Sequence, residues 1–588
     1  MKKRFLIPLI ASAMLAMVSC STKNADQTNS ASFDLGGSDY GYNESISIEE
    51  PEEIEVEEND GEFEFLTEDG EYSKDGSIYA IQKAGTYSCS GSLNGQILIE
   101  AGEEDEVVLE LNGASIAYDG DSPIKAISGS KLEVSAKKDT ENLVKDTRNN
   151  KSVDSEFQGE GAISSDIDLK LKGSGTLVVE GNYNNAVHTT KDLSLQKLTL
   201  KAIGYNNALK GKDSVTISSG TVQAYAQNGN GIKTEDSDLS SKGNQRGTIL
   251  IEGGNVYVDS LHDAIDASYN VEISEADSEA PTKISIKTGT YSSSYSKSTF
   301  KADSEKGLKA QNSILVNQGT VVISASDDAI HANYGDALDN GAKGEGNITV
   351  NGGLIQVASG DDGLHADNTL TVNDGKIVVT GATEGYEANY ININGGYSYI
   401  YGTDDGVNCS KKSFNSCAFT MAGGYLDVAV KNGDTDGIDS NGNFTLTGGT
   451  IVTRGSPGTM GGGMSTGLDV DGTISMSGGT LIAFNGLEKS PSVSGSVKYA
   501  GTSGATSSTG FGGRGGNPGG QTSGSSSLQS GNYVLSGTNL EVSFVNDYAY
   551  GSFLVYSSYL TNGATYTLSR NGSTIYSWNQ TANSVTIS

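Results

Sequence analysis

A unit of about 22 residues recurs through the middle of this chain, and this repeat limits the possible folds more than any other feature. Each unit carries a small residue, Gly or Ala, followed by an apolar or aromatic residue. We call these twelve pairs anchors: Ala162-Ile163, Ala186-Val187, Ala208-Leu209, Gly231-Ile232, Ala264-Ile265, Gly307-Leu308, Ala329-Ile330, Gly363-Leu364, Gly385-Tyr386, Gly406-Val407, Gly437-Ile438 and Gly467-Leu468. The longer gaps between anchors contain polar inserts, at 235–247, 291–305, 335–346 and 410–417. A period of this length is typical of a solenoid of stacked units.

The pattern inside one unit indicates short strands. Within residues 348–366, apolar residues alternate in two runs separated by Gly352-Gly353, and a third run follows Asp361-Asp362-Gly363. Alternation with a period of two indicates strands, and paired glycines indicate a turn that needs positive φ. Three short strands form one coil, which buries its inner face only when coils stack. The sequence therefore predicts an all-β fold, a right-handed parallel β-helix over residues 62–500.

The ends of the stack need covering, because a terminal coil exposes unpaired strand edges. Residues 62–140 have the pattern of irregular first coils. Residues 501–530 are rich in Gly and Ser and are predicted to form a linker. Residues 531–588 return to alternating Tyr and Val, which predicts a small β cap or module.

The first 20 residues have the composition of an export signal. Lys2, Lys3 and Arg4 precede an apolar run that is too short for a permanent membrane span. The run ends in Met17-Val18-Ser19-Cys20, which resembles a bacterial lipobox cut before the cysteine. We therefore expect an exported protein, lipid-anchored through Cys20 to the bacterial cell envelope. Residues 21–61 are polar and acidic, and are predicted to be a disordered tether.

Charge and cysteine content narrow the function further. The 588-residue chain has a formal net charge of −34, which excludes nucleic acid as a partner because phosphates require a basic surface. Besides Cys20 the chain contains Cys89, Cys409 and Cys417, and this odd number favours three buried thiols over a disulfide between the last two. We expect a monomer whose only membrane contact is the lipid.

Stacking turns equivalent positions of the repeat into columns of side chains. The position before the anchor is occupied by Asn185, Asn207, Asn230, Asp263, Lys306, Asp328, Asp362, Glu384, Asp405 and Asp436. The position after the anchor is occupied by His188, Lys210, Lys233, Asp266, Lys309, His331, His365, Glu387, Asn408, Asp439 and Asp469. Both columns are rich in acidic residues between residues 327 and 439.

Stacked carboxylates predict a cation. Two of them about 5 Å apart repel by roughly 3 kcal/mol at an effective dielectric constant near 20. No Arg lies between Arg246 and Arg454, so we expect no compensation from basic residues. Repeated oxygen donors suit calcium as cofactor, although Asp next to Gly is also ordinary turn chemistry. The candidate ligands are Asp263, Asp266, Asp327, Asp328, Asp361, Asp362, Glu384, Glu387, Asp404, Asp405, Asp436 and Asp439.

Histidine, tyrosine and lysine side chains add further candidates. His331 and His365 share a column, where exposed stacked rings are favoured over a two-histidine metal site. Tyr397, Tyr399 and Tyr401 lie on one strand face, where their rings either stack on sugars or stabilise the strand from its solvent side. Lys306 and Lys309 are the remaining candidate carbohydrate contacts.

Several short phrases of the repeat occur together in a known family. They are Lys306-Gly-Leu-Lys-Ala310, Asp328-Ala-Ile-His-Ala332, Asp362-Gly-Leu-His-Ala366 and Glu384-Gly-Tyr-Glu387, with repeated Gly-Gly-Thr turns. Over roughly residues 87–490 the chain resembles bacterial carbohydrate-binding β-helix proteins, which are similar in fold to pectate lyases. The resemblance implies binding of calcium and of acidic sugars or cellulose. Tyr386 and the two cysteines in or beside the 410–417 insert depart from the family pattern.

The sequence therefore predicts calcium-dependent, non-catalytic binding of an acidic or plant cell-wall polysaccharide, similar to polygalacturonate or to cellulose. Two alternatives stay open. A polysaccharide lyase would need calcium and a basic side chain that removes a proton, for which Lys306, Lys309, Lys343 and Lys376 are candidates. A surface adhesin or structural β-helix would need no sugar ligand.

Overall fold

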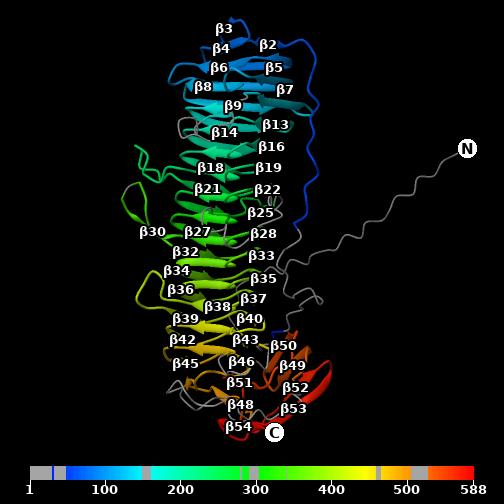
Figure 1. The fold of residues 1–588 in the computed structure, drawn as a ribbon, viewed down its shortest axis with the longest axis vertical. Helices are drawn as coiled ribbons and strands as arrows, with labels where there is room; N and C mark the ends of the chain where they lie inside the picture. Colours follow the sequence, from blue (N-terminus) through cyan, green and yellow to red (C-terminus); the bar gives the residue numbers. More distant parts are fainter. Residues whose placement is uncertain are drawn as a thin grey trace, which may run out of the picture.

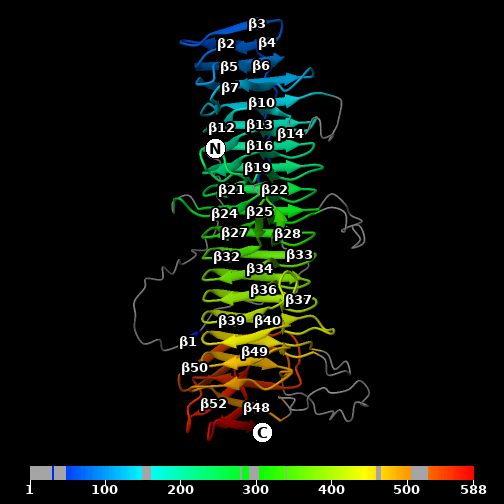
Figure 2. The same cartoon turned by 90° about the vertical axis from the view of Figure 1, so that its left-hand side faces the viewer.

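The computed structural model describes residues 30–31, 48–148, 160–277, 281–289, 304–339, 341–457, 465–503, 505 and 528–588. Over these residues the chain is all-β, and one sheet of 47 strands contains most of it. The strands form a long stack of coils (Figures 1 and 2), most of them paired in parallel. A helix long and apolar enough to cross a membrane is absent from these ranges. The export signal and Cys20 lie outside the described residues.

From residue 160 onward the strands stand in three columns, because most of them pair in parallel with the strand three places later. The first column contains β12 (Asp168–Gly173), β15 (Asp192–Gln196), β18 (Ser214–Ile217), β21 (Thr248–Ile251), β24 (Asn270–Ile273), β27 (Ser313–Val316), β32 (Asn347–Val350), β39 (Ala418–Met421), β42 (Asn443–Leu446), β45 (Ile474–Met476) and β47 (Ser492–Val493). The second contains β13 (Thr176–Gly181), β16 (Leu198–Gly204), β19 (Gly220–Ala226), β22 (Asn255–Ser260), β25 (Lys283–Thr288), β28 (Thr320–Ala325), β33 (Leu354–Ser359), β35 (Lys376–Ala382), β37 (Tyr397–Gly402), β40 (Tyr425–Val430), β43 (Thr450–Arg454) and β46 (Thr480–Phe484).

The third column begins each coil with its anchor. It contains β11 (Gly161–Ser165), β14 (Asn185–Thr189), β17 (Leu209–Gly211), β20 (Ile232–Lys233), β23 (Ile265–Ala267), β26 (Leu308–Ala310), β29 (Ile330–Ala332), β38 (Val407–Cys409), β41 (Ile438–Ser440) and β44 (Leu468–Val470). In two coils one long strand, β34 (Leu364–Val372) or β36 (Tyr386–Ile393), serves both the third and the first column. Residues before 149 form earlier coils from β4 (Ile78–Ile81), β5 (Gly85–Asn94), β6 (Gln96–Glu100), β7 (Glu106–Tyr118), β8 (Ile124–Ser128), β9 (Lys131–Ala136) and β10 (Glu141–Asp146).

The register of the third column confirms the anchors. From Ile163 opposite Val187 to Ile438 opposite Leu468, every anchor pairs with the next one along the chain. The first anchor residue is small because the coils approach closely there. A Cβ atom added at Gly363 would lie 2.5 Å from the carbonyl oxygen of Gly385 in the next coil. The Gly-Gly turn is also confirmed, since Gly353 has φ of +84°.

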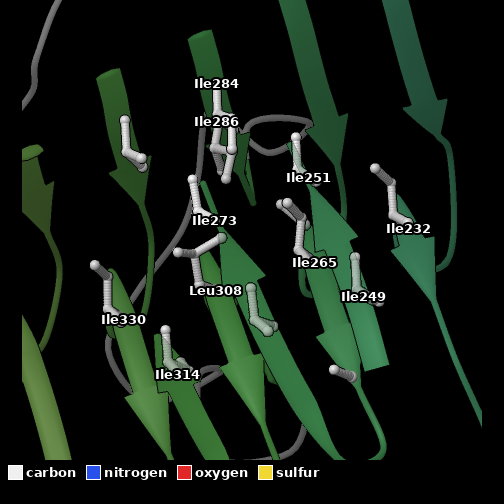
Figure 3. Close-up of a cluster of buried hydrophobic side chains, with 14 of the residues drawn as sticks. Ile232, Ile249, Ile251, Ile265, Ile273, Ile284, Ile286, Leu308, Ile314 and Ile330 are labelled. Carbon is white, nitrogen blue, oxygen red and sulfur yellow. The ribbon is translucent and has the colours of Figure 1, made fainter. Parts of the chain in front are cut away.

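The apolar core fills the inside of the stack along its length. Figure 3 shows side chains from the three columns meeting there, among them Ile265 and Leu308 from the third column, Ile249 from the first and Ile286 from the second. These four side chains are completely buried. Burial of one such side chain contributes about 1.5–3 kcal/mol. Cys89, Cys409 and Cys417 are buried free thiols, as predicted.

Antiparallel strands cover both ends of the stack. At the first end, β2 (Glu64–Thr67) pairs with β5 and β3 (Tyr72–Asp75) pairs with β4. At the other end, β51 (Phe553–Ser557) runs antiparallel to β46 and to β48 (Lys498–Thr502), and β54 (Ser584–Ile587) extends β48. A separate sheet is formed by β1 (Ser30–Ala31), β50 (Leu540–Asn546), β49 (Gly531–Gly537), β52 (Thr565–Arg570) and β53 (Ser573–Asn579). We call residues 528–588 the C-terminal module.

Two segments lie against the outward face of the second column (Figure 1). The C-terminal module packs on it near β37 to β46. Residues 48–58, which we call the strap, run along it beside β16 to β25. This part of the chain was expected to be a free tether, but polar side chains of the stack hold it in place.

The C-terminal module also changes the interpretation of the tyrosines. Tyr397, Tyr399 and Tyr401 share one strand face as expected, but they are 5%, 6% and 1% exposed because they pack in the same apolar cluster as the module. Tyr397 stacks on Tyr425, with ring centroids 5.2 Å apart. The prediction that these three rings face solvent or sugar is therefore wrong, since another part of the chain covers them.

Candidate functional site

The two predicted side-chain columns exist on the third column of strands. The residues after the anchors lie opposite one another, for example His331 beside His365 and His365 beside Glu387. The residues before the anchors are joined by hydrogen bonds at the turn that enters each coil. The backbone N–H of Asp362 donates to Asp328 Oδ1 (2.9 Å), and that of Asp436 donates to Asp405 Oδ1 (2.8 Å). One carboxylate oxygen therefore stabilises the turn, and the second is available for another partner.

Lysines neutralise the first part of this acidic stretch. Lys309 Nζ lies 2.9 Å from Asp263 Oδ2, and Lys233 Nζ lies 2.9 Å from Asp266 Oδ2. Lys306 Nζ lies 2.7 Å from Asp327 Oδ2 and 2.6 Å from Asp328 Oδ2.

The expectation that basic residues do not compensate the acidic column is therefore wrong for this part of the column. The lysines occupy the same two columns one coil away, so stacking places them against the carboxylates. Lys306 and Lys309 are held in ion pairs and are not free sugar contacts. Asp263 and Asp266 likewise have partners already.

A compact group of acidic and histidine side chains follows, and we call it the acid–histidine cluster: Asp328, His331, Asp362, His365, Asp367 and Glu387. His331 Nδ1 lies 2.6 Å from Asp328 Oδ2, and His365 Nδ1 lies 2.8 Å from Asp362 Oδ2. The two imidazole rings stack with centroids 4.3 Å apart and planes 7° apart.

The far side of each histidine ring also faces a carboxylate. Asp367 Oδ1 lies 3.3 Å from His365 Nε2 and 3.6 Å from His331 Nε2. Burial lowers the pKa of His365, but the nearby carboxylates of Asp367, Asp328 and Glu387 outweigh this effect and raise it. The stacked pair was predicted correctly, but His365 is only 8% exposed, because its column neighbours and Asp367 enclose it.

Two overlapping groups of carboxylates stand at the turn beside this cluster. Asp361, Asp362 and Glu384, which we call the three-carboxylate group, have oxygen atoms within 4.8 Å of one another. Asp327, Asp328 and Asp361 form a second such group, but Lys306 already contacts its first two members. Burial, the hydrogen bond with Asp362 and the neighbouring negative charges raise the pKa of Glu384 to about 9. A divalent cation would relieve this crowding, and the donor set consists of the oxygen atoms that calcium prefers.

The acidic column continues into the last coils. Burial and the charges of neighbouring carboxylates raise the pKa of Asp405 to about 8 and those of Asp436 and Asp439 to about 6. Asp404 is exposed at the same turn. These four predicted ligands line the column, but their carboxylates do not share a cluster as compact as the three-carboxylate group.

Aromatic side chains stand beside the acid–histidine cluster at the corner where the third column leads into the first. The 335–346 and 410–417 inserts leave the stack there, and β30 (Tyr334–Ala337) and β31 (Lys343–Glu345) form a hairpin in the former. The rings of Tyr334 and Phe414 have centroids 4.7 Å apart, and those of Tyr390 and Phe414 are 6.1 Å apart. We call these three half-exposed rings the aromatic wall. The wall is connected to the acid–histidine cluster, because the backbone N–H of Tyr334 donates a hydrogen bond to Asp367 (2.8 Å).

The sequence-based prediction missed three residues of the site. Asp367 lies two residues beyond His365 in β34, so strand alternation alone would have placed it on the same face. Lys412 comes from an insert and forms an ion pair with Glu387. Phe414 comes from the same insert, and inserts follow no repeat that would predict their contacts.

Comparisons with known proteins relate this chain to a family model, a curated relative and a solved structure. A family model described as "Carbohydrate-binding domain-containing protein" matches residues 75–363 and 335–488. A curated carbohydrate-binding domain-containing protein from Acetivibrio thermocellus is 35% identical over 126 residues, which are 21% of this chain and 44% of that relative. The match thus spans less than half of the relative's length. A solved polysaccharide lyase-like protein from C. thermocellum, a gadolinium derivative, is 31% identical with a TM-score of 0.32, covering 38% of this chain and 86% of that one.

Proposed function

Because this chain belongs to the family of carbohydrate-binding domain-containing proteins, we propose that it binds an acidic polysaccharide of the polygalacturonate type, with calcium, and without cutting it. The proposed binding surface is the outward face of the third column, from the three-carboxylate group across the acid–histidine cluster to the aromatic wall. The observation that carries the proposal is this juxtaposition of an oxygen-only carboxylate group and half-exposed aromatic rings.

Calcium would reverse the local sign of charge. A chain of net charge −34 repels a polyuronate unless a cation stands between them. Asp361, Asp362 and Glu384 would hold calcium, which supplies positive charge and open positions for a sugar carboxylate when bound. Asp362 Oδ1 meanwhile accepts the backbone N–H of Glu384 (3.2 Å), which keeps the two side chains side by side.

The aromatic wall and the length of the stack would supply the remaining affinity. Aromatic rings present flat apolar faces on which sugar rings pack. The stack offers acidic positions in several successive coils, so weak contacts can add along a long polymer. We take the stack to be a right-handed parallel β-helix, since connections between parallel strands are nearly always right-handed.

Two of the four candidate lyase bases, Lys306 and Lys309, argue for binding without cleavage. A lyase needs a neutral base, whereas burial beside Asp327 and Asp328 leaves Lys306 paired with two carboxylates. Burial lowers the pKa of Lys309, but the charges of Asp266 and Asp263 outweigh this effect and raise it. Both amines therefore stay protonated at neutral pH.

A panel of immobilised polysaccharides tests the proposed function. In calcium we expect retention on polygalacturonate, weaker retention on cellulose, and none on neutral soluble glucans. Retention on none of them would contradict the proposal and favour an adhesin or structural role.

We further propose that the protein is exported and anchored by a lipid on Cys20. Replacement of Cys20 with alanine should move the protein from the membrane fraction to the soluble fraction, because the single lipid site would be lost. The matched variant Ser19→Ala should stay in the membrane fraction. Unchanged membrane attachment of Cys20→Ala would contradict the anchor.

A further inference from the structure

The strap is an acidic segment that lies on basic and aromatic side chains of the second column. Seven of its eleven residues are Glu, and it contains no Lys or Arg. It runs along the stack over several coils (Figure 1). The surface beneath it is formed by the second column of strands, whereas the proposed calcium-dependent surface is formed by the third.

Carboxylates of the strap are bound by lysine and tyrosine side chains. Glu50 forms an ion pair with Lys287 and accepts a hydrogen bond from Tyr257 Oη (2.8 Å). Glu53 Oε1 lies 3.6 Å from Lys201 Nζ. The side chains of Glu50 and Glu53 are 64% and 71% exposed, whereas those of Lys287 and Lys201 are 20% and 14% exposed. The lysines thus belong to the stack surface, and the glutamates lie over them.

The same surface also binds the backbone of the strap. Gln223 Nε2 donates to the carbonyl oxygen of Glu52 (2.8 Å), and Lys201 Nζ donates to that of Ile54 (3.1 Å). These donors come from successive coils, so they repeat along the stack axis. The surface therefore offers two kinds of contact to an extended chain: cations for its charges and donors for its neutral oxygens.

Aromatic rings complete this surface. The rings of Tyr225 and Tyr257 have centroids 5.7 Å apart, and Lys201 Nζ lies 5.9 Å from the centroid of Tyr225. Beside them a cavity of about 370 Å³ opens between strap and stack, lined by Glu50, Glu53, Lys201 and Tyr225 among others. We call Lys201, Gln223, Tyr225, Tyr257 and Lys287 the basic groove.

We propose that the basic groove is a second binding site for a linear anionic polysaccharide, one that needs no calcium, and that the strap occupies it as an internal competitor. A uronate polymer carries the same features as the strap, namely regularly spaced carboxylates and neutral oxygen acceptors, and adds sugar rings that can lie on the two tyrosines. This inference rests on the proposed affinity of the chain for acidic polysaccharides.

The interactions that hold the strap are weak enough for a ligand to displace it. Ion pairs with exposed partners contribute little individually and weaken with salt. The strap is nevertheless tethered to the site, so it competes at a high effective concentration. Loss of its two bound carboxylates should therefore open the groove.

The test measures binding of polygalacturonate oligomers in excess chelator, because the calcium-dependent surface should not bind them without calcium. The variant Glu50→Gln with Glu53→Gln should bind about three- to tenfold more tightly than the wild-type chain. The matched control is Glu55→Gln with Glu57→Gln, which changes the net charge equally at exposed strap residues and should bind like the wild type. Adding Lys201→Gln and Lys287→Gln to the strap variant should abolish its gain.

Three results would overturn the inference. They are equal binding by the strap variant and its control, unchanged binding after removal of the two lysines, and equal binding of poly-glutamate, which would indicate charge alone. Hydrogen exchange gives a second measurement, because polygalacturonate should raise exchange in residues 48–58 of the wild-type chain. Wild-type binding in calcium together with any of these three results would refute the groove and leave the proposed function standing.

Discussion

Replacing Arg454 with alanine is expected to loosen β49 and β50 of the C-terminal module from the stack and to lower the free energy of unfolding by about 3–5 kcal/mol. Arg454 is buried and forms an ion pair with Asp427, which is buried in the neighbouring coil. Its Nη2 donates to the carbonyl oxygen of Val545 (2.8 Å) and its Nε to Asn546 Oδ1 (2.6 Å). The variant would lose both of these hydrogen bonds to β50 and leave the charge of Asp427 buried without its basic partner.

Thermal unfolding and hydrogen exchange in β49 and β50 would measure this effect. The control is Arg454→Met combined with Asp427→Leu, which removes both charges and fills the space with apolar atoms. It should recover most of the stability, because a buried ion pair can often be replaced by apolar residues at little cost. Normal melting and normal protection of β49 and β50 in Arg454→Ala would show that this pair does not hold the module.

The second large effect is expected at the three-carboxylate group. Asp361→Asn with Glu384→Gln should abolish most of the calcium-induced rise in melting temperature and weaken polygalacturonate binding in calcium at least about tenfold. A ligand at 100 times its dissociation constant stabilises the folded state by about 2.7 kcal/mol, and this contribution disappears with the site. Both substitutions preserve size and leave the pair of Asp362 and His365 intact.

Differential scanning calorimetry with and without calcium would measure the change. The matched control is Glu103→Gln with Asp119→Asn, which removes the same charge from exposed positions in the early coils and should behave like the wild type. A full calcium response in Asp361→Asn with Glu384→Gln would exclude the three-carboxylate group as the calcium site.

The stack could be predicted well from the sequence because each repeat is defined by residues that are close together in the chain. Each anchor combines a small residue with an apolar one, and the close approach of coils at Gly363 shows why only that combination fits. Once the anchors are aligned, the columns of acidic and histidine residues follow by simple counting. The register of these columns therefore needed no knowledge of distant contacts.

The predictions that were wrong concern residues whose surroundings depend on contacts between distant segments of the chain. The burial of Tyr397, Tyr399 and Tyr401 is caused by a module more than a hundred residues later, and alternation in a strand cannot reveal what covers its outer face. The strap likewise has the composition of a free chain, but side chains from four coils hold it, namely Lys201, Gln223, Tyr257 and Lys287.

The prediction that basic residues leave the carboxylates uncompensated was wrong for a related reason. Lys306 compensates Asp327 and Asp328 because stacking brings neighbouring coils within ion-pair distance, although they lie about one repeat apart in sequence. Lys412 reaches Glu387 from an insert, where no periodicity applies. Asp361, Asp362 and Glu384 were among the predicted calcium ligands, but the repeat alone did not show that their carboxylates lie within 4.8 Å of one another.

Calorimetric titration of the wild-type chain with polygalacturonate oligomers of increasing length tests the central claim most directly. The titration is made in calcium, then with excess chelator, then after calcium is restored, while unsaturated uronate products are assayed in the same samples. We expect affinity that increases with oligomer length in calcium, falls at least about tenfold with chelator and returns with calcium, with no unsaturated product. Equal affinity with chelator would contradict calcium-dependent binding, and calcium-dependent release of unsaturated uronates would make the protein a lyase.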